Sequence, residues 1–267
     1  MIAGLQPKSQ IAAFFDLDGT LVMGPSLERR YFRMLRQRRA IPIQNYFLWL
    51  AHAAQLAPAG IGPILHANKM YLRGVRADYG VLSLAGARRT RRPDLHSRQE
   101  HVPPFFPQAV DRVAWHAAQE HSVVLVTGTL APLAEEMALA LLLRLALRGL
   151  TASITVCATR LDRVDGRWTG RIVGDALFGE AKARAMWHLA ARAGFDLKRC
   201  YAYGDTAKDR WMLGAVGRPA VVNPSGELAR IARLLDWPML WWGKNAEEPG
   251  DQPTYTTVAG AKTESLR

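Results

Sequence analysis

The sequence predicts an α/β fold in which helices cover both faces of a parallel sheet and an all-helical segment interrupts the chain after the first strand. Two observations lead to this prediction. Short apolar runs rich in β-forming residues alternate with stretches of helical periodicity, as in parallel sheets that are buried on both faces. Residues 25–103 break this alternation, because they show helical periodicity without clear strands.

Five apolar runs are expected to form the sheet, and four segments between them have the periodicity of helices. The expected strands are residues 11–15, 123–126, 154–157, 200–203 and 220–222, and the expected helices are residues 108–121, 133–148, 179–193 and 226–235. Residues 161–170 predict a β-hairpin appended to the sheet, because Asp165-Gly166 supplies the residues of a tight turn.

The interrupting segment is predicted to be a set of short helices separated by Pro and Gly. Within it, residues 43–57 are apolar, uncharged and too short to span a bilayer. We expect them to pack inside the segment, with a helix lying in a membrane interface as the alternative. At the other end of the chain, residues 244–267 are rich in Gly, Pro, Thr and charge, and we expect them to lack fixed structure.

Positive charge is concentrated in the interrupting segment. The chain carries a net charge of +12, and residues 25–103 contribute +10 of it, with 14 Lys or Arg against 4 acids. Arginines cluster at residues 29–39 and again at residues 88–92. The preferred interpretation is a solvated face, and the alternatives are attraction of an anionic substrate, a membrane surface or a nucleic acid.

The 267 residues suffice for one large domain or for a domain with a smaller insertion. Cys157 and Cys200 lie in strand-like runs and are expected to be buried free thiols in a reducing compartment. The first ten residues lack the pattern of a secretion signal, and no long uninterrupted apolar run follows, so a cytoplasmic protein is expected. His116 and His121 are five residues apart and do not predict a metal-ligand pair on one helical face.

The most informative motif is Asp16-Leu17-Asp18-Gly19-Thr20, which follows the first apolar run directly. Residues i and i+2 of a strand point to the same side, so the two carboxylates can converge on one reacting group. Gly19 allows the sharp exit that the end of a strand needs. The motif indicates a nucleophile for phosphoryl transfer.

Other polar residues are expected at the same edge of the sheet, because open α/β folds gather their site residues at the carboxyl ends of parallel strands. Thr127 and Gly128 end the second run, Asp205 and Asp209 follow the run 200–203, and Lys182 opens the helix before that run. Carboxylate oxygens for Mg²⁺, a nucleophilic carboxylate and a lysine for phosphate form a coherent set.

At these positions the sequence resembles the haloacid dehalogenase superfamily of phosphatases and phosphotransferases. Its four motifs are matched in order by residues 16–20, 126–129, 182 and 204–209, and the flanking residues 165–170, 178–182 and 217–224 are similar to the phosphoserine-phosphatase-like subfamily IB. The resemblance implies a Rossmann-like parallel-sheet core of residues 10–24 and 104–243. It also implies an inserted helical cap of the C1 type at residues 25–103, ahead of the tail at residues 244–267.

The resemblance implies a Mg²⁺-dependent phosphomonoester hydrolase that acts on a phosphorylated small molecule through an aspartyl-phosphate. The implied catalytic residues are Asp16, Asp18, Thr127 and Lys182; the implied phosphate-binding residues are Thr127, Gly128 and Lys182; and the implied metal-binding residues are Asp16, Asp18, Asp205 and Asp209. Asp16 would be the nucleophile, and Asp18 the general acid and base. The backbone carbonyl of Asp18 would contact the ion.

The sequence departs from the phosphoserine-phosphatase pattern at two places. Lys208 stands where those enzymes tend to have Asn, and residues 24–26 stand near their usual acid for the substrate amine. Phosphoserine is therefore a doubtful substrate. Two alternatives stay open, a lipid-phosphate phosphatase at an anionic membrane surface and a basic nucleic-acid-binding protein on a relic phosphatase core. The intact motifs and the lack of an interleaved aromatic platform argue against the second.

Overall fold

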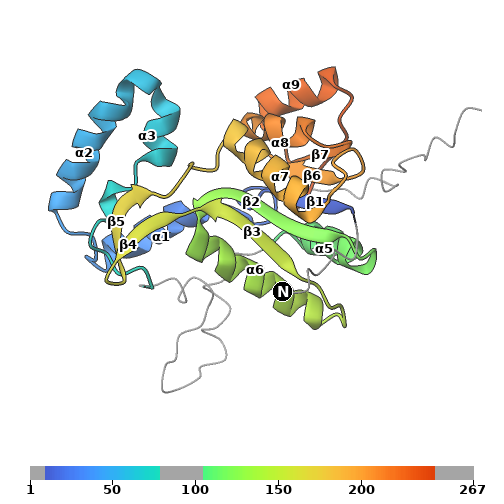
Figure 1. Ribbon diagram of the computed structural model, residues 1–267, viewed down its shortest axis with the longest axis horizontal. Helices are drawn as coiled ribbons and strands as arrows, with labels where there is room; N and C mark the ends of the chain where they lie inside the picture. The colour runs from blue at the N-terminus through green and yellow to red at the C-terminus, as the bar shows by residue number, and fades with distance from the viewer. Residues whose placement is uncertain (1–9, 79–104, 244–267) are drawn as a thin grey trace, which may run out of the picture.

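The computed structural model describes residues 10–78 and 105–243 (Figure 1). Six parallel strands form its sheet in the order β3-β2-β1-β6-β7-β8. They are β1 (Ala12–Phe15), β2 (Ser122–Leu130), β3 (Ile154–Thr159), β6 (Tyr201–Gly204), β7 (Arg218–Val222) and β8 (Met239–Leu240). The predicted parallel α/β fold is confirmed, and every predicted strand is present. The two-residue strand β8 was not predicted.

Side chains of the central strand β1 alternate between the two faces of the sheet. Ala13 and Phe15 pack in one apolar cluster with α5 (Pro107–Ala118) and α6 (Ala131–Ala146). Ala12 and Phe14 pack in a second cluster on the opposite face, with residues of α7, α8 and α9. Those helices span Glu180–Ala193, Arg210–Gly214 and Gly226–Leu234. Figure 1 shows the resulting three layers, with α5 and α6 on one side of the sheet and α7 to α9 on the other.

The predicted hairpin is confirmed as β4 (Leu161–Val164) and β5 (Arg167–Ile172). Asp165 and Gly166 both have positive φ, 49° and 71°, as a two-residue turn of type I′ requires. The inserted segment adds to this hairpin, because the Trp168 N–H donates to the Val75 carbonyl at 2.9 Å. The hairpin, which follows β3 of the core, therefore also packs against the inserted segment through backbone hydrogen bonds.

The described part of that segment is helical, as predicted. It contains α1 (Leu27–Gln37), α2 (Gln44–Leu56), a 3₁₀ turn η1 (Ala57–Ala59), α3 (Ile61–Ala67) and a second 3₁₀ turn η2 (Met70–Leu72). Helix α1 buries Leu27, Tyr31 and Leu35 in the same cluster as the core. Helices α2 and α3 stand away from the sheet in Figure 1. Residues 79–103 of the predicted cap and the predicted tail 244–267 lie outside the described residues, so those domain boundaries stay predictions.

One expectation about this segment is confirmed only in part. Residues 43–57 were expected to pack inside the segment, and Trp49 does pack against the core cluster, but Ile43 is 73% exposed, Phe47 68% and Leu50 59%. These three apolar side chains face outward, while the inner side of α2 also makes polar contacts.

The prediction that Cys157 and Cys200 are free thiols is confirmed. The prediction that they are buried is confirmed for Cys200, whereas Cys157 is half-buried.

Candidate active site

The first motif lies where β1 ends, at the centre of the sheet. Asp16 extends the pairing with β6, because its N–H donates to the Tyr203 carbonyl at 2.9 Å. The chain then turns sharply at Gly19, whose φ is +84°. A Cβ at this glycine would lie 2.1 Å from an Asp205 carboxylate oxygen, so only glycine fits beside that aspartate.

Lys182 from the first turn of α7 reaches into the space above β1. Its Nζ lies 2.7 Å from Asp16 Oδ1 and 2.6 Å from Asp209 Oδ1. All three side chains are buried. Burial works against a charged lysine, but the charges of Asp16 and Asp209 outweigh it and raise the pKa of Lys182 above its ordinary value. Lys182 is therefore a cation shared by two carboxylates.

The carboxylate of Asp18 is fixed from two sides. The N–H of Leu27, at the start of α1, donates to Oδ1 at 2.8 Å, and the Thr129 hydroxyl donates to Oδ2 at 2.5 Å. Burial raises the pKa of Asp18, so the group is suited to carry a proton. Thr129 has no assigned role in the sequence prediction, although it stands two residues beyond Thr127 in the second motif. Its spacing on the same side of β2 could have indicated it.

The second motif interrupts the regular pairing of β2. The register between β2 and β3 shifts between Thr127 and Leu130. Thr127 is buried, and its hydroxyl oxygen accepts the Thr129 N–H at 3.2 Å. A Cβ at Gly128 would lie 3.1 Å from the Leu177 carbonyl, so the backbone passes close to the loop before α7. The irregular strand directs this backbone toward the site rather than into the sheet.

The fourth motif folds into the short turn η3 (Ala207–Asp209) after β6. Asp209 caps this turn, because its Oδ2 accepts the Thr206 N–H at 3.0 Å and the Thr206 hydroxyl at 2.9 Å. Gly204 leaves room for it, since a Cβ there would lie 2.6 Å from the Asp209 Cβ. One oxygen of Asp209 therefore caps the turn, while the other contacts Lys182.

Three carboxylates converge at this point. One oxygen from each of Asp16, Asp205 and Asp209 lies within 4.8 Å of the other two. Burial, together with the neighbouring carboxylates, raises the pKa of Asp16 to about 7 and that of Asp205 to about 8. Oδ1 of Asp205 is buried and has no hydrogen-bond partner among the described residues. An all-oxygen set with an orphaned carboxylate oxygen fits a hard cation such as Mg²⁺.

The carboxylate of Asp18 is not a member of this cluster. Its two oxygens are engaged by Leu27 and Thr129, which leaves the backbone carbonyl as the Asp18 group implied for metal binding. The structure thus brings together Asp16, Lys182, Asp205 and Asp209, and it fixes Asp18 separately between α1 and β2.

An ion pair within the inserted segment lies near Asp18, and one contact of the segment reaches the fourth motif. Glu28 on α1 forms an ion pair with Lys69, and the Tyr71 hydroxyl donates to the same carboxylate at 2.9 Å. On the other side, His66 Nε2 on α3 lies 2.6 Å from Lys208 Nζ, which belongs to η3. The His66 ring also stacks on Phe178 with the centroids 4.7 Å apart. The segment therefore reaches the fourth motif directly.

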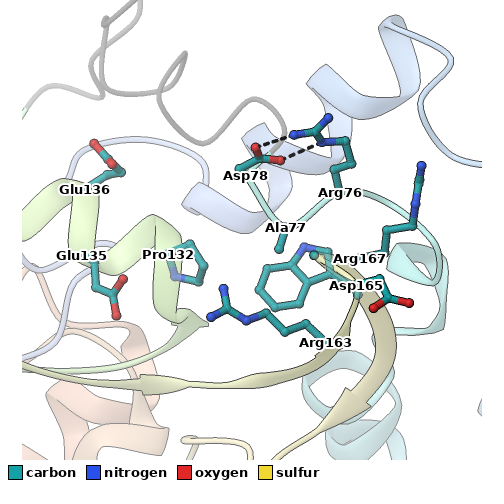
Figure 2. Close-up of a pocket in the computed structure, with 11 residues that line it drawn as sticks. Arg76, Ala77, Asp78, Pro132, Glu135, Glu136, Arg163, Asp165 and Arg167 are labelled. Carbon is teal, nitrogen blue, oxygen red and sulfur yellow. Dashed lines mark hydrogen bonds and ion pairs between the residues drawn. The ribbon is translucent and has the colours of Figure 1, made fainter.

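Two surface pockets flank the inserted segment without including the motif carboxylates. Figure 2 shows the first, of about 720 Å³, where Arg76, Arg163 and Glu135 line an opening between the hairpin and α6. Arg76 pairs with Asp78 at its rim (Figure 2). The second, of about 890 Å³, lies between the inserted segment and the start of α7. It is lined by Phe178 and Ala181, next to Lys182.

A carboxylate at the end of the central strand, a lysine bridging two acids and a cluster of carboxylates define a hydrolase site for phosphoryl groups on a parallel sheet. The chain belongs to the haloacid dehalogenase-like hydrolase family, whose model matches residues 13–214. It is an enzyme of the phosphatase class, in agreement with the names of two of its relatives.

The chain is 31% identical to a probable phosphatase of Mycobacterium tuberculosis, over 98% of this chain and 86% of the relative. It is also 31% identical to a phosphoserine phosphatase of the same organism, over 85% of this chain and 69% of the relative. A crystal structure of a protein of unknown function from Bordetella pertussis matches 87% of this chain and 99% of its own, with 27% identity and a TM-score of 0.60.

Proposed function

We propose that this phosphatase hydrolyses phosphomonoesters of small molecules with Mg²⁺ as its cofactor and Asp16 as its nucleophile. The observation that carries the proposal is the position of Asp16, which ends the central strand beside Lys182 and within 4.8 Å of the Asp205 and Asp209 carboxylates, measured between their oxygens. A nucleophilic carboxylate needs nearby positive charge to approach a dianionic phosphate.

In the first step the Asp16 carboxylate attacks phosphorus, and the bond between phosphorus and the ester oxygen breaks. Asp18 gives its proton to the departing alkoxide, so the product leaves as an alcohol. In the second step Asp18 takes a proton from water, whose oxygen attacks the phosphorus of the aspartyl-phosphate. Phosphate is released and the carboxylate of Asp16 is restored. The raised pKa of Asp18 supports its role as the first proton donor.

Asp209, whose two oxygens contact Lys182 and Thr206, would support the ion through water or through Lys182. The ion itself would be held by the carboxylates of Asp16 and Asp205 and by the backbone carbonyl of Asp18. When bound, it supplies positive charge that lowers the repulsion between the phosphate and these carboxylates. Lys182, which contacts both Asp16 and Asp209, supplies a second positive charge. Thr127 and the N–H of Gly128 lie at the end of the neighbouring strand β2, where they would donate to the transferring oxygens.

The surroundings of Glu28 bear on the choice of substrate. An acid near Asp18 could receive the ammonium group of an amino-acid phosphate, but Glu28 is already paired with Lys69, a side chain with 2% of its surface exposed. Lys208 adds positive charge at the fourth motif. We infer that the alcohol part of the substrate is neutral or anionic rather than cationic, which agrees with the departures from the phosphoserine-phosphatase pattern.

The experiment is phosphate release by purified protein across sugar phosphates, nucleotides, phosphoserine and lysophosphatidate, with Mg²⁺, with EDTA and with the Asp16→Asn variant. The proposal expects release from at least one neutral or anionic ester that needs both Mg²⁺ and Asp16. Release that persists in EDTA or in Asp16→Asn would refute it. Release from lysophosphatidate alone would favour the lipid-phosphate alternative.

A further inference from the structure

The inward side of helix α2 carries Asn45 and His52, together with Trp49, which packs against the core cluster. The Asn45 amide donates to the Tyr71 carbonyl at 3.0 Å and to the Arg73 carbonyl at 2.7 Å. About two turns later, His52 Nδ1 lies 3.1 Å from the Asn68 side-chain oxygen. Asn45 is buried although it is polar. These contacts fix which side of α2 faces inward.

The opposite side of α2 is apolar and exposed. Ile43, Tyr46, Phe47 and Leu50 follow the spacing i, i+3, i+4, i+7 of one helical face, and they are 73%, 37%, 68% and 59% exposed. We refer to these four side chains as the outer stripe. Residues 44–56 contain no charged residue at all. An ordinary surface helix presents polar side chains on its outer side, so the outer stripe departs from that pattern.

Three arginines flank the start of this helix. Arg38 and Arg39 precede it and are exposed, and the exposed Arg73 is tied to it through the bond from Asn45. Within residues 10–78 and 105–243, no carboxylate lies in ion-pair distance of these three arginines.

Acids do not offset this charge in the described part of the inserted segment. Residues 25–78 contain nine Lys or Arg and two acids, Glu28 and Asp78. Both acids are already paired, with Lys69 and Arg76 respectively. The surface around α2 therefore offers apolar side chains next to uncompensated positive charge.

We propose that α2 docks the protein on an anionic lipid bilayer, with the outer stripe among the acyl chains just below the headgroups and the arginines on lipid phosphates. Charge complementarity selects this occupant, because an uncharged amphipathic helix flanked by basic residues matches an anionic interface. The 13 residues of α2 extend about 20 Å and would lie in the interface plane. No helix among the described residues is long and apolar enough to cross a membrane.

A second exposed apolar row, on α6, provides a matched control. Leu139, Leu143 and Leu147 are 52%, 59% and 88% exposed. The exposed Glu135 continues this row one turn earlier, which opposes binding to anionic lipid. Helix α6 lies against the sheet, away from α2 (Figure 1).

The test is co-sedimentation of the full chain with vesicles of phosphatidylcholine, with or without phosphatidylglycerol. We expect binding that depends on phosphatidylglycerol and weakens as salt is added. Phe47→Gln with Leu50→Gln should reduce the partition coefficient at least about tenfold, because two exposed apolar anchors are lost. The double variant Arg38→Gln, Arg73→Gln should reduce the partition coefficient about fivefold for each arginine that is lost. Leu139→Gln with Leu143→Gln should leave it unchanged.

Three results would overturn the proposal. One is no binding of the wild type to anionic vesicles, and another is an equal loss of binding in the α6 variant. The third is self-association in sedimentation velocity without lipid that the α2 variant abolishes, which would assign the outer stripe to a second copy of the chain. Thermal unfolding shows whether each variant is folded. None of these readouts uses catalysis, so the result is independent of the proposed function.

Discussion

Lys182 Nζ lies 2.7 Å from Asp16 Oδ1, although the two residues are 166 positions apart in the chain. The contact joins the helix α7 to the end of the central strand. Because the same ammonium also lies 2.6 Å from Asp209, it compensates two buried carboxylates at once. The stability of the site and its charge balance therefore depend on one lysine.

Replacing this lysine should destabilise the protein in a way that a divalent cation corrects. Lys182→Met removes the charge but keeps most of the volume. The free energy of unfolding without metal should fall by about 3 kcal/mol, because buried carboxylates lose their partner. Added Mg²⁺ should restore part of this loss while phosphate release stays abolished. Denaturant unfolding with and without Mg²⁺ measures the loss of stability and its partial recovery. An unfolding free energy equal to that of the wild type in the absence of metal would contradict the interpretation.

Thr129 should act by positioning Asp18. Thr129→Val keeps the shape and removes the hydroxyl that donates to Asp18 at 2.5 Å. We expect kcat to fall by about tenfold to a hundredfold with little change in KM, because the proton donor is misplaced while substrate binding is kept. Thr129→Ser should retain most of the activity. If the serine variant loses as much as the valine variant, the hydroxyl is not the group that matters.

Gly19 should be irreplaceable for a reason specific to the site. In Gly19→Ala the new methyl group would overlap an Asp205 carboxylate oxygen, in addition to the strain of the positive φ. The matched control is Gly149→Ala, where φ is +72° and nothing lies within 4 Å of the added carbon. Both variants should lose about 1 kcal/mol from backbone strain, but only Gly19→Ala should lose Mg²⁺ binding in calorimetry. Equal Mg²⁺ affinity in the two variants would argue against Asp205 as a ligand.

His116 should make folding sensitive to acid. It is buried between Tyr203 and His121, with ring nitrogens 2.9 Å from each, and burial, aided by His121, lowers its pKa to about 2. The unfolded chain binds a proton near pH 6.5 and the folded chain does not, so stability is full above that pH and declines as the pH falls. The decline contributed by His116 should be about 1.4 kcal/mol per pH unit.

The variant His116→Gln tests this assignment, because glutamine keeps polar atoms but does not titrate in this range. Its free energy of unfolding should be lower than that of the wild type at pH 7 and should change less between pH 7 and pH 5. Urea unfolding at several pH values gives both slopes. An unchanged slope in the variant would show that other groups cause the acid sensitivity.

Most of the sheet and its helices could be predicted from the sequence, because their apolar runs are long and their periods distinct. Strand β8, with only Met239 and Leu240, is too short to have a period. Helix α8 (Arg210–Gly214) is likewise only five residues long and was not predicted. Local pattern therefore finds the main elements and misses the shortest ones.

The candidate site could be placed through strand ends, but its contacts could not. Asp16 and Lys182 were expected near each other, whereas the bond from Thr129 to Asp18 depends on the irregular register of β2. The spacing of His116 and His121 did not place them on one helical face, yet their rings meet, because α5 ends at Ala118 and the chain turns back. Such contacts follow from tertiary geometry, which spacing alone does not report.

The orientation of α2 is the clearest limit of pattern reasoning. Periodicity identifies an apolar face but not the surroundings that the face meets. The hydrogen bonds of Asn45 to the backbone of η2 and its neighbour decide the orientation, and they join residues more than 25 positions apart. The outer stripe consequently faces solvent.

The most direct test of the central claim is rapid acid quenching of a reaction with Mg²⁺ and an active phosphoester, followed by mass spectrometry of the peptides. We expect one added phosphoryl group on the peptide that contains Asp16, absent in Asp16→Asn and lost on treatment with hydroxylamine. Turnover of the ester with no phosphoryl group on that peptide at any quench time, or with one on a different residue, would contradict it.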